Sequence, residues 1–505
     1  MSPTIMDFSL KPLLEHPAQY LSQLGIAVFI WAIFAVVGKA FYNVYLHPLR
    51  QFPGPFLARA TSLWRSYKIF NGDLPQTVKQ LHDKYGPVVR ISPFELSFIE
   101  SQAWKDIYGH HGSYEMAKDD RFYRAMGKHI PDSIITADRE QHGFLRRQLS
   151  HGFSERAMRE QEPIFRSYVD VLMKRLEEYA DTNRPADMTA WFNFTTFDVI
   201  GYLAFGSDFG CLDKSYYHPW VKAITSNLKD LASIRALQQY LPSSVIFKLM
   251  QLGLFKGRRS HLAHTKALVK SRMEVKEPRP DFIEGLLKKK DVLTVGELEI
   301  NAQLLTLAGS ETTATLLSGA LFLLGSHPDV LDKLVKEVRT FFRNEDEINL
   351  VSVNGLNYML ACLNEAFRLY PPVPIGLPRV VPEGGFKIAG NWVPQDTSVA
   401  VWQLAANYSP RNFTNPEEYR PERFLGDPEF AEDDLSAMQP FSVGPRNCIG
   451  RNLAYAEMRL ILARILFRFD VKLAPEARDW LKGQRVYSLW DKPPLPFYLK
   501  AAEAK

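Results

Sequence analysis

Cysteine is scarce in this chain, which has three among its 505 residues: Cys211, Cys362 and Cys448. Three thiols cannot all pair, and these lie far apart in the sequence, so they argue against a disulfide framework and for a reducing compartment. The excess of basic over acidic residues is also small for a chain of this length, with a formal net charge of +5. Nucleic-acid binding is therefore not expected, whereas a modest basic excess suits an anionic membrane surface or an acidic protein partner.

Linkers and repeats are lacking as well. After the N-terminus the sequence contains no Gly/Ser-rich linker, no long run of one charge and no internal repeat. Length alone would suggest about three domains. Because no boundary is visible, we predict one large domain instead, with 46% hydrophobic residues available for its core.

The longest nearly unbroken apolar run near the N-terminus extends from Leu21 to Val37. It is long enough to span a bilayer, and no cleavage site of small residues follows it, which disfavours a signal peptide. Basic residues lie beyond it, at Lys39, Arg50, Arg59, Arg65 and Lys68. By the positive-inside rule, the rest of the chain then faces the cytosol. We predict a lumenal segment over 1–20, a transmembrane anchor over 21–42, a proline-rich linker over 43–56 and the large domain over 57–505.

Cys448 belongs to a glycine-containing loop that runs from Phe441 to Gly450. Gly444 and Gly450 lack a Cβ, so the backbone could pass close to a large planar ligand. The apolar periodic run from Asn452 predicts a helix, whose N-terminal dipole would stabilise an anionic sulfur just before it. The alternative is a small buried hydrophobic side chain in an ordinary turn.

A long helical pattern runs from Val295 to Ser326 and is apolar on nearly every face, which predicts a helix buried through the middle of the protein. Its centre reads Ala308-Gly309-Ser310-Glu311-Thr312-Thr313. Glycine costs about 1 kcal/mol in a helix interior, and a buried carboxylate costs more, so a functional role is indicated. A tolerated irregularity of the helix is the alternative.

Two pairs of polar residues occur at helical spacing. Glu365 and Arg368 are three apart and His142 and Arg146 are four apart, so each pair shares one face of a predicted helix. On its own the first pair is weak evidence, and the second is also consistent with a solvated basic face. Alternating apolar residues predict a hairpin over 85–100, strands over 386–401 and a short terminal hairpin over 484–490.

The loop pattern Phe-x-x-Gly-x-Arg-x-Cys-x-Gly, with the helix centre and the Glu-x-x-Arg pair, resembles the cytochrome P-450 family over about Phe52 to Lys500. The resemblance implies a mainly α fold with small β-sheets (α+β), a single large haem-thiolate catalytic domain preceded by the anchor. Cys448 would be the axial thiolate ligand of the haem b iron. Glu311 and Thr312 would be catalytic, handling protons during dioxygen activation. The other implied haem contacts are Arg446, His142, Arg146, Arg379, Phe441 and Gly450.

The resemblance implies two further groups of residues. A buried charge network that fixes the haem loop would comprise Glu365, Arg368 and Arg423. The substrate pocket would be lined by Leu305, Ala308, Gly309, Val373, Ile375, Leu377 and Tyr487. At position 142 the family often has tryptophan where this chain has histidine, which keeps a hydrogen-bond donor but departs from the pattern.

The implied activity is that of a monooxygenase that hydroxylates or further oxidises a hydrophobic small molecule. Short sequence motifs such as Pro53-Gly54-Pro55 are similar to those of fungal microsomal members of the family, many of which act on terpenoid, polyketide or alkaloid skeletons. The chain carries no flavin or nicotinamide fingerprint, so electrons would come from NADPH-cytochrome P-450 reductase, with cytochrome b5 as a further candidate donor. We expect a single-pass protein of the endoplasmic reticulum membrane whose catalytic domain faces the cytosol, with no nucleic-acid partner.

A second class of activity is compatible with the same cofactor. Some haem-thiolate enzymes are isomerases or dehydratases that act on oxygenated substrates without external electrons. The acid and the threonine of the helix centre are often missing from those enzymes, whereas Glu311 and Thr312 are both present here. The sequence does not identify the substrate, the position oxidised or the number of oxidation steps.

Overall fold

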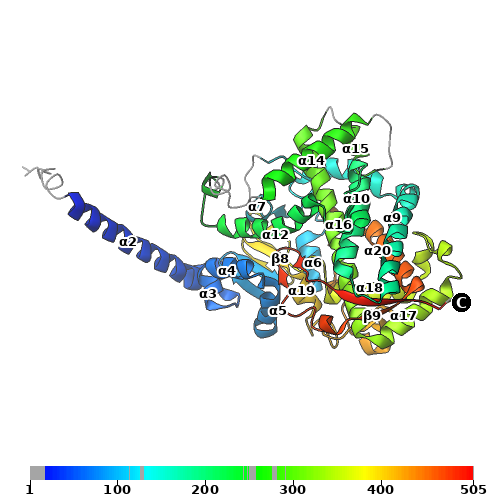
Figure 1. Cartoon of the computed structure of the whole chain (residues 1–505). Coiled ribbons are helices and arrows are strands. Elements are labelled where there is room, and N and C mark those ends of the chain that lie inside the picture. The colour runs from blue at the N-terminus through cyan, green and yellow to red at the C-terminus, as the bar shows by residue number, and fades with distance from the viewer. Residues whose placement is uncertain are drawn as a thin grey trace, which may run out of the picture.

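The structure is a computed structural model that describes residues 17–112, 114–124, 130–242, 244–246, 248, 257–275, 281–289 and 292–503. Helices form most of the body, and the largest sheet lies toward the side from which the N-terminal helix extends (Figure 1). The predicted mainly α fold with small sheets is confirmed.

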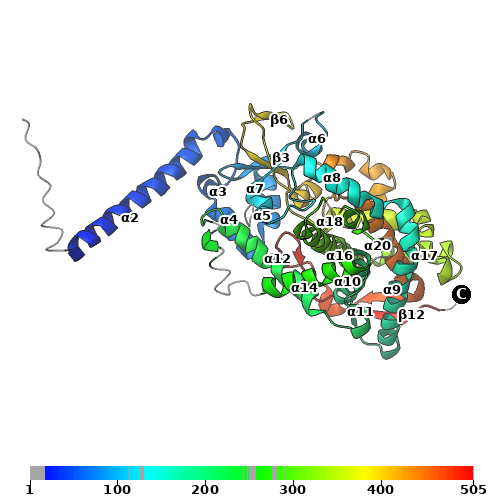
Figure 2. The same cartoon turned by 90° about the horizontal axis from the view of Figure 1, so that it is seen from above.

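The N-terminal helix α2 (Pro17–Phe41) projects away from the body in both Figure 1 and Figure 2. The apolar span Leu21–Leu46 has 26 residues, and none of its most apolar stretch is buried. These are the length and exposure that a membrane-crossing helix needs. The structure therefore confirms an apolar N-terminal helix that could serve as a membrane anchor. The apolar span continues through a π-helical turn (Tyr42–Leu46).

The helices that follow α2 and precede the long central helix are α3 (Phe56–Ala60), α4 (Leu63–Asn71), α5 (Leu74–Tyr85), α6 (Ser101–Tyr108), α7 (Asp120–Tyr123), α8 (Arg139–Ser150), α9 (Glu155–Thr182), α10 (Met188–Phe205), α11 (Cys211–Lys214), α12 (Pro219–Leu237), α14 (Gly257–Glu274) and α15 (Glu284–Leu287). Those from the central helix onward are α16 (Val295–Ser326), α17 (Pro328–Phe341), α18 (Asn357–Leu369), α19 (Gln403–Asn407) and α20 (Arg451–Arg468).

The central helix α16 has the predicted bounds. The Thr294 hydroxyl and the Glu297 carboxylate form a reciprocal capping box at its start, and Pro328 begins the next helix directly after its end. Most of its side chains are buried, and it packs along α10 and against α18 and α20. Although α16 is apolar and long enough to cross a membrane, 78% of its most apolar stretch is buried, which identifies it as a core helix.

The strands of the described residues form four small sheets. The largest has five strands in the order β1-β2-β8-β5-β3, and β2 and β8 pair in parallel although about 300 residues separate them. The predicted hairpin over 85–100 is confirmed as β1 and β2, and the terminal hairpin as β10 and β11. The strand bounds are β1 (Val88–Ser92), β2 (Glu95–Phe98), β3 (Ala117–Lys118), β4 (Ala186–Asp187), β5 (Arg379–Val380), β6 (Phe386–Ile388), β7 (Asn391–Val393), β8 (Ser398–Val401), β9 (Phe469–Leu473), β10 (Arg485–Val486), β11 (Trp490–Asp491) and β12 (Pro496–Ala501).

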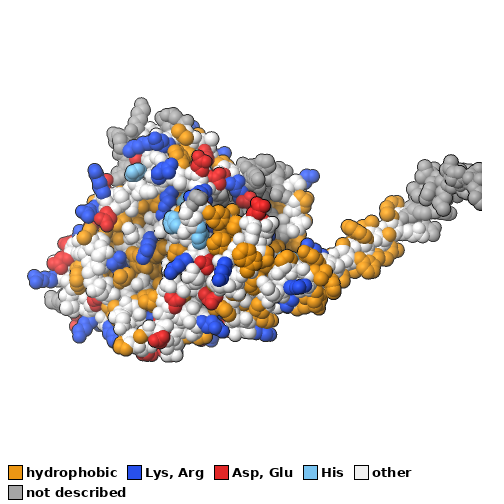
Figure 3. Space-filling view, turned by 180° about the vertical axis from the view of Figure 1, so that it is seen from behind, with side chains coloured by type: hydrophobic (Ala, Val, Ile, Leu, Met, Phe, Trp, Pro, Cys, Tyr) orange, Lys and Arg blue, Asp and Glu red, His pale blue; other side chains and the backbone are white. Residues whose placement is uncertain are grey.

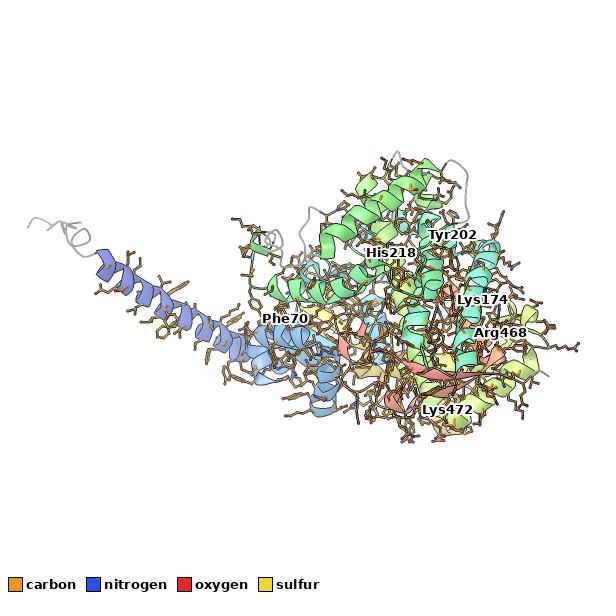
Figure 4. The ribbon with its side chains drawn as sticks, in the orientation of Figure 1. Phe70, Lys174, Tyr202, His218, Arg468 and Lys472 are labelled. Atoms are coloured by element: carbon orange, nitrogen blue, oxygen red, sulfur yellow. The ribbon has the colours of Figure 1, made fainter. Side chains whose placement is uncertain are left out.

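An apolar surface adjoins the place where α2 meets the body. Figure 3 shows hydrophobic side chains gathered on this side and along α2. The exposed residues of α3 and α4 that contribute are Phe56, Leu57, Leu63, Tyr67 and Phe70. Figure 4 shows Phe70 at the end of α4 close to α12, so this surface continues toward the helices that cover the central cavity.

Candidate active site

The loop before α20 presents Cys448 to a large cavity. Gly444 has φ +75°, and a Cβ on it would lie 1.9 Å from the Tyr108 carbonyl oxygen, so the turn requires glycine there. The Cys448 N–H donates to the Phe441 carbonyl at 2.9 Å, which closes the loop. A Cβ on Gly450 would lie 4.0 Å from the Cys448 Sγ. Gly444 therefore allows close packing against the Tyr108 backbone, whereas a Cβ on Gly450 would make only ordinary contacts beside the sulfur.

The cavity has a volume of about 970 Å³ and is bounded by α8, α12, α16, the strand β5 region and the cysteine loop. The predicted site residues that line it are Cys448, Phe441, Arg446, His142, Arg146, Arg379, Leu305, Ala308, Thr312, Val373, Ile375 and Leu377. Sequence segments from five parts of the chain thus meet around one chamber.

Apart from the charge network of Glu365, Arg368 and Arg423, four predicted site residues lie elsewhere. Gly309 faces α10, where a Cβ would be 2.9 Å from the Ile200 side chain, so its role is helix packing. Glu311 points away from the cavity toward the C-terminal hairpin. Tyr487 lines a smaller neighbouring cavity, and Gly450 lies beside the sulfur without lining either cavity.

One wall of the cavity is crowded with cations. Arg379 is buried, and its Nη1 has no hydrogen-bond partner in the described part of the chain. Burial, together with Arg379 and Arg446, lowers the pKa of Lys118 to about 6. Burial and then Arg446 and Lys118 lower the pKa of His142 to about 3. Neighbouring cations thus disfavour the charged forms of Lys118 and His142, and an anion bound among them would favour those forms.

The nearby acceptors satisfy only part of this cluster. Glu115 pairs with Arg446 at 2.5 Å, and Arg146 donates to the carbonyl and side-chain oxygens of Asn447 at 2.7 and 2.6 Å. The unpartnered Nη1 of Arg379 and the mutual repulsion of these cations fit the two propionates of a haem. Lys118 was not predicted: β3 pairs Lys118 with Arg379 on β5, a non-local contact that no local motif indicates.

The Cys448 sulfur faces the cavity, which is itself surrounded by protein. This enclosure raises the pKa of its thiol, while the Gly450 N–H and the cations Arg146 and Arg451 act in the opposite direction. Burial therefore opposes the stabilisation of a thiolate that we expect from the helix N-terminus, and burial has the larger effect on this pKa. Ligation to a metal cation would favour the deprotonated sulfur and so offset the effect of burial.

Thr312 and Glu311 face different sides of α16. The half-buried Thr312 hydroxyl donates to the Ala308 carbonyl at 2.6 Å, so its oxygen lone pairs remain to accept a hydrogen bond from the cavity. Glu311 forms an ion pair with Lys492, which follows β11, and both side chains are 3% exposed. Lys492 also donates to the Thr315 hydroxyl at 2.8 Å. Sequence reasoning missed Lys492, which no motif marks.

The predicted charge network is assembled in the interior. Glu365 pairs with Arg368 at 2.7 Å and with Arg423 at 3.4 Å, and all three side chains are completely buried. Arg368 donates to the Asn407 carbonyl at 2.9 Å, and Arg423 pairs with Asp433 as well. The network joins α18 to the chain that leads into the cysteine loop, so it specifies the position of that loop more than it adds stability.

A cysteine presented to a deep cavity, a buried helix with a threonine on the opposite wall and a cationic wall suited to propionates together define a haem-thiolate oxidoreductase. The chain belongs to the cytochrome P450 family, whose sequence profile (Cytochrome P450) matches residues 51–500.

Curated relatives agree in length as well as in sequence. Cytochrome P450 monooxygenase tpeC of Talaromyces stipitatus is 46% identical over 501 residues, which cover 97% of this chain and 98% of that protein. Cytochrome P450 monooxygenase 1 of Neocamarosporium betae is 48% identical over 466 residues, covering 92% and 96%. Trichothecene C-15 hydroxylase of Fusarium sporotrichioides is 46% identical over 470 residues, covering 91% and 94%. The chain is thus a P450 monooxygenase related to fungal enzymes of secondary-metabolite pathways.

Proposed function

We propose that this protein is a microsomal monooxygenase that oxidises a hydrophobic intermediate of the terpenoid, polyketide or alkaloid type in fungal secondary metabolism. The observation that carries the proposal is the cavity of about 970 Å³ that Cys448 and Thr312 both line. A chamber of this size accommodates a polycyclic or long-chain small molecule together with a cofactor. The relative named trichothecene C-15 hydroxylase supports hydroxylation as the reaction.

Cys448 would be the axial ligand of haem b, and Arg379, Arg446, His142 and Lys118 would hold its propionates. Haem with a thiolate ligand supplies the activation of dioxygen. The protein would supply orientation through the Glu365 network, which joins α18 to the chain leading into the cysteine loop. It would supply electrostatics through the cavity cations, which would neutralise the cofactor's carboxylates.

Thr312 would place its hydroxyl group, which can take part in proton transfer, in the cavity where the substrate reacts. Its hydrogen is engaged by the Ala308 carbonyl at 2.6 Å, so the hydroxyl oxygen can orient a water or the reacting group by accepting a hydrogen bond. Glu311, one residue earlier, would supply protons from the side of Lys492. Transfer from Glu311 to the cavity requires that its carboxylate turn from Lys492 or that water connect its unpaired Oε2 to the cavity.

The substrate end of the cavity supports a hydrophobic ligand. Apolar side chains from several elements line it, including Leu305, Val373, Leu377, Ile234 and Leu489. Burial of such side chains against a ligand contributes about 25 cal/mol for each Å² removed from water. This lining supports the proposal of a substrate with an apolar skeleton.

The anchor and the basic residues beyond it support attachment to the endoplasmic reticulum with the catalytic domain in the cytosol. There the enzyme would receive electrons from NADPH-cytochrome P450 reductase, with cytochrome b5 as a further candidate donor. The apolar surface of α3 and α4 would rest on the same membrane, because five large hydrophobic side chains are exposed there: Phe56, Leu57, Leu63, Tyr67 and Phe70.

One experiment tests both activity and mechanism. Membranes that contain the full-length protein and its reductase are supplied with candidate pathway intermediates, and product mass and NADPH consumption are measured for the wild type and Thr312→Ala. We expect product only with NADPH. In Thr312→Ala, NADPH consumption should continue while product falls by about 10²-fold or less, the low end for a positioned proton-transfer group, with hydrogen peroxide formed instead.

Thr313→Ala is the matched control. Thr313 also borders the cavity, but the residue is only 3% exposed and its hydroxyl donates to the Gly309 carbonyl at 3.0 Å, so this change should lower product yield much less. Turnover without NADPH would establish the isomerase or dehydratase alternative. Equal product per NADPH in wild type and Thr312→Ala would remove the proton-transfer role from Thr312.

A further inference from the structure

We propose that Arg235 of α12 binds a carboxylate on the substrate, so that the natural substrate is a hydrophobic acid. The inference rests on the proposed monooxygenase function and narrows its substrate class. It comes from an unusual feature of the cavity wall, a guanidinium enclosed by protein with few of its donors used.

Arg235 stands at the junction of two cavities. It lines the large cavity that contains Cys448 and Thr312, and it also lines a small neighbouring cavity of about 60 Å³. The small cavity lies between α4, α5, the five-stranded sheet and the β10–β11 hairpin. A ligand group bound to Arg235 would therefore be held at an edge of the chamber, while the rest of the ligand extends into it.

Packing fixes the guanidinium in place. Its Nη1 donates to the Ser488 hydroxyl at 3.0 Å, and its Cζ lies 4.3 Å from the centre of the Phe122 ring. The Nε is buried and has no partner within the described residues. Burial lowers the pKa of Arg235 to about 10, so it stays cationic at neutral pH. Since an arginine has five N–H donors, most of this one's capacity remains for a ligand.

The carboxylates of the small cavity are already paired with other cations. Glu95 binds Arg65 at 2.6 Å, and Asp119 binds Arg121 at 2.7 Å. The wall of the small cavity therefore holds three arginines and two carboxylates, and Arg235 is the arginine that forms no ion pair within the described part of the chain. A guanidinium removed from water without a counter-ion is unfavourable, which an incoming anion would relieve.

The carboxylates of the large cavity do not compensate Arg235 either. Asp132 pairs with Arg124 at 3.0 Å, and neither Asp230 nor Glu299 forms an ion pair with Arg235 in the described structure. The stretches 223–227, 243–256 and 257–264, whose side chains are wholly or largely outside the description, contain no Asp or Glu. Among the described residues, no carboxylate that lines either cavity forms an ion pair with Arg235.

A carboxylate fits this site better than a neutral acceptor. Its two oxygens match the planar fork of a guanidinium, and charge-assisted hydrogen bonds are roughly twice as strong as neutral ones. The Ser488 hydroxyl beside Nη1 could donate its own hydrogen to the same carboxylate. Ser488 adopts φ +80° at the tip of the hairpin, an uncommon conformation for serine that aims this side chain at Arg235.

Matched ligand pairs test the proposal. Full-length protein in lipid nanodiscs is titrated with dodecanoic acid against 1-dodecanol and with abietic acid against abietinol, and dissociation constants are read from the shift of the Soret band. We expect the wild type to bind the acid of at least one pair about tenfold or more tightly than the alcohol, as charged hydrogen bonds allow. Arg235→Gln should abolish this preference and leave alcohol binding unchanged.

Lys229→Gln is the control, because it removes one positive charge from the same helix but from an exposed side chain. It should keep the preference for the acid. Should Arg235→Gln not incorporate haem, Arg235→Lys is compared instead, and the acid preference should fall because the planar fork is lost. Absence of an acid preference in the wild type, or its persistence in the Arg235 variants, overturns the proposal. A wild type that binds carbon monoxide without the thiolate-type Soret band would instead refute the monooxygenase function.

Discussion

Replacing Lys492 by methionine tests whether Glu311 depends on a buried cation. The two side chains are each 3% exposed, and they join the middle of α16 to the segment after β11. Methionine has a similar length, so the change removes the charge and the hydrogen bond to Thr315 while it largely fills the space. The prediction concerns folding stability first and proton transfer second.

The expected magnitude follows from the burial. Removing one partner of a buried ion pair leaves an uncompensated charge and costs about 3–5 kcal/mol. Glu311 cannot recover this loss locally, because its Oε2 already lacks a hydrogen-bond partner among the described residues. Replacing both partners by methionine removes both charges, and such double replacements are often close to neutral. The two substitutions should therefore be strongly non-additive, with a coupling energy of about 2 kcal/mol or more.

The assay is urea unfolding followed by far-ultraviolet circular dichroism, with the thiolate-type Soret band of the carbon monoxide complex recorded in parallel. Lys492→Met, Glu311→Met and the double variant are compared with Lys482→Met. Lys482 pairs with Asp479 on the surface, where its side chain is 80% exposed, so its loss should cost less than about 1 kcal/mol. If Lys492→Met costs no more than Lys482→Met, or if the double variant equals the sum of the single ones, the reasoning is wrong.

Two further predictions concern a buried acid and the anchor. Glu457 of α20 is 1% exposed, and burial raises its pKa from 4.5 to about 8. Between these two pH values the folded protein keeps a proton on Glu457 that the unfolded chain releases. The free energy of unfolding should therefore fall as the pH rises from 4.5 to about 8. Glu457→Gln should remove this pH dependence and should be more stable than the wild type near pH 8. Urea midpoints that depend on pH in the same way in the variant and the wild type would contradict this prediction. Removing the residues before Phe52 should shift the protein from the membrane pellet toward the supernatant with its Soret band intact, although Phe56 and Leu57 should retain some attachment; complete retention in the pellet would contradict the anchor role.

Local patterns were sufficient for much of the fold. The bounds of α16 followed from apolar residues that end before His327-Pro328, and the hairpin of β1 and β2 followed from alternation interrupted at Ser92-Pro93. What local patterns could not give is the pairing of distant segments. The parallel contact between β2 and β8, and the placement of Lys118 beside Arg379, depend on how the whole chain returns on itself.

The centre of α16 shows most directly where sequence reasoning must stop. Successive residues of a helix point about 100° apart, so neighbouring residues such as Glu311 and Thr312 need not face the same cavity. The sequence showed that two polar residues were buried there, but it could not show which one faces the cavity. Which residue faces the cavity depends on Lys492, which lies 181 residues from Glu311 in the sequence. Its ion pair holds the Glu311 carboxylate on the side of the helix away from the cavity. Because Lys492 holds Glu311 away from the chamber that Thr312 lines, any proton that Glu311 contributes must cross the helix by rotation of its carboxylate or through water.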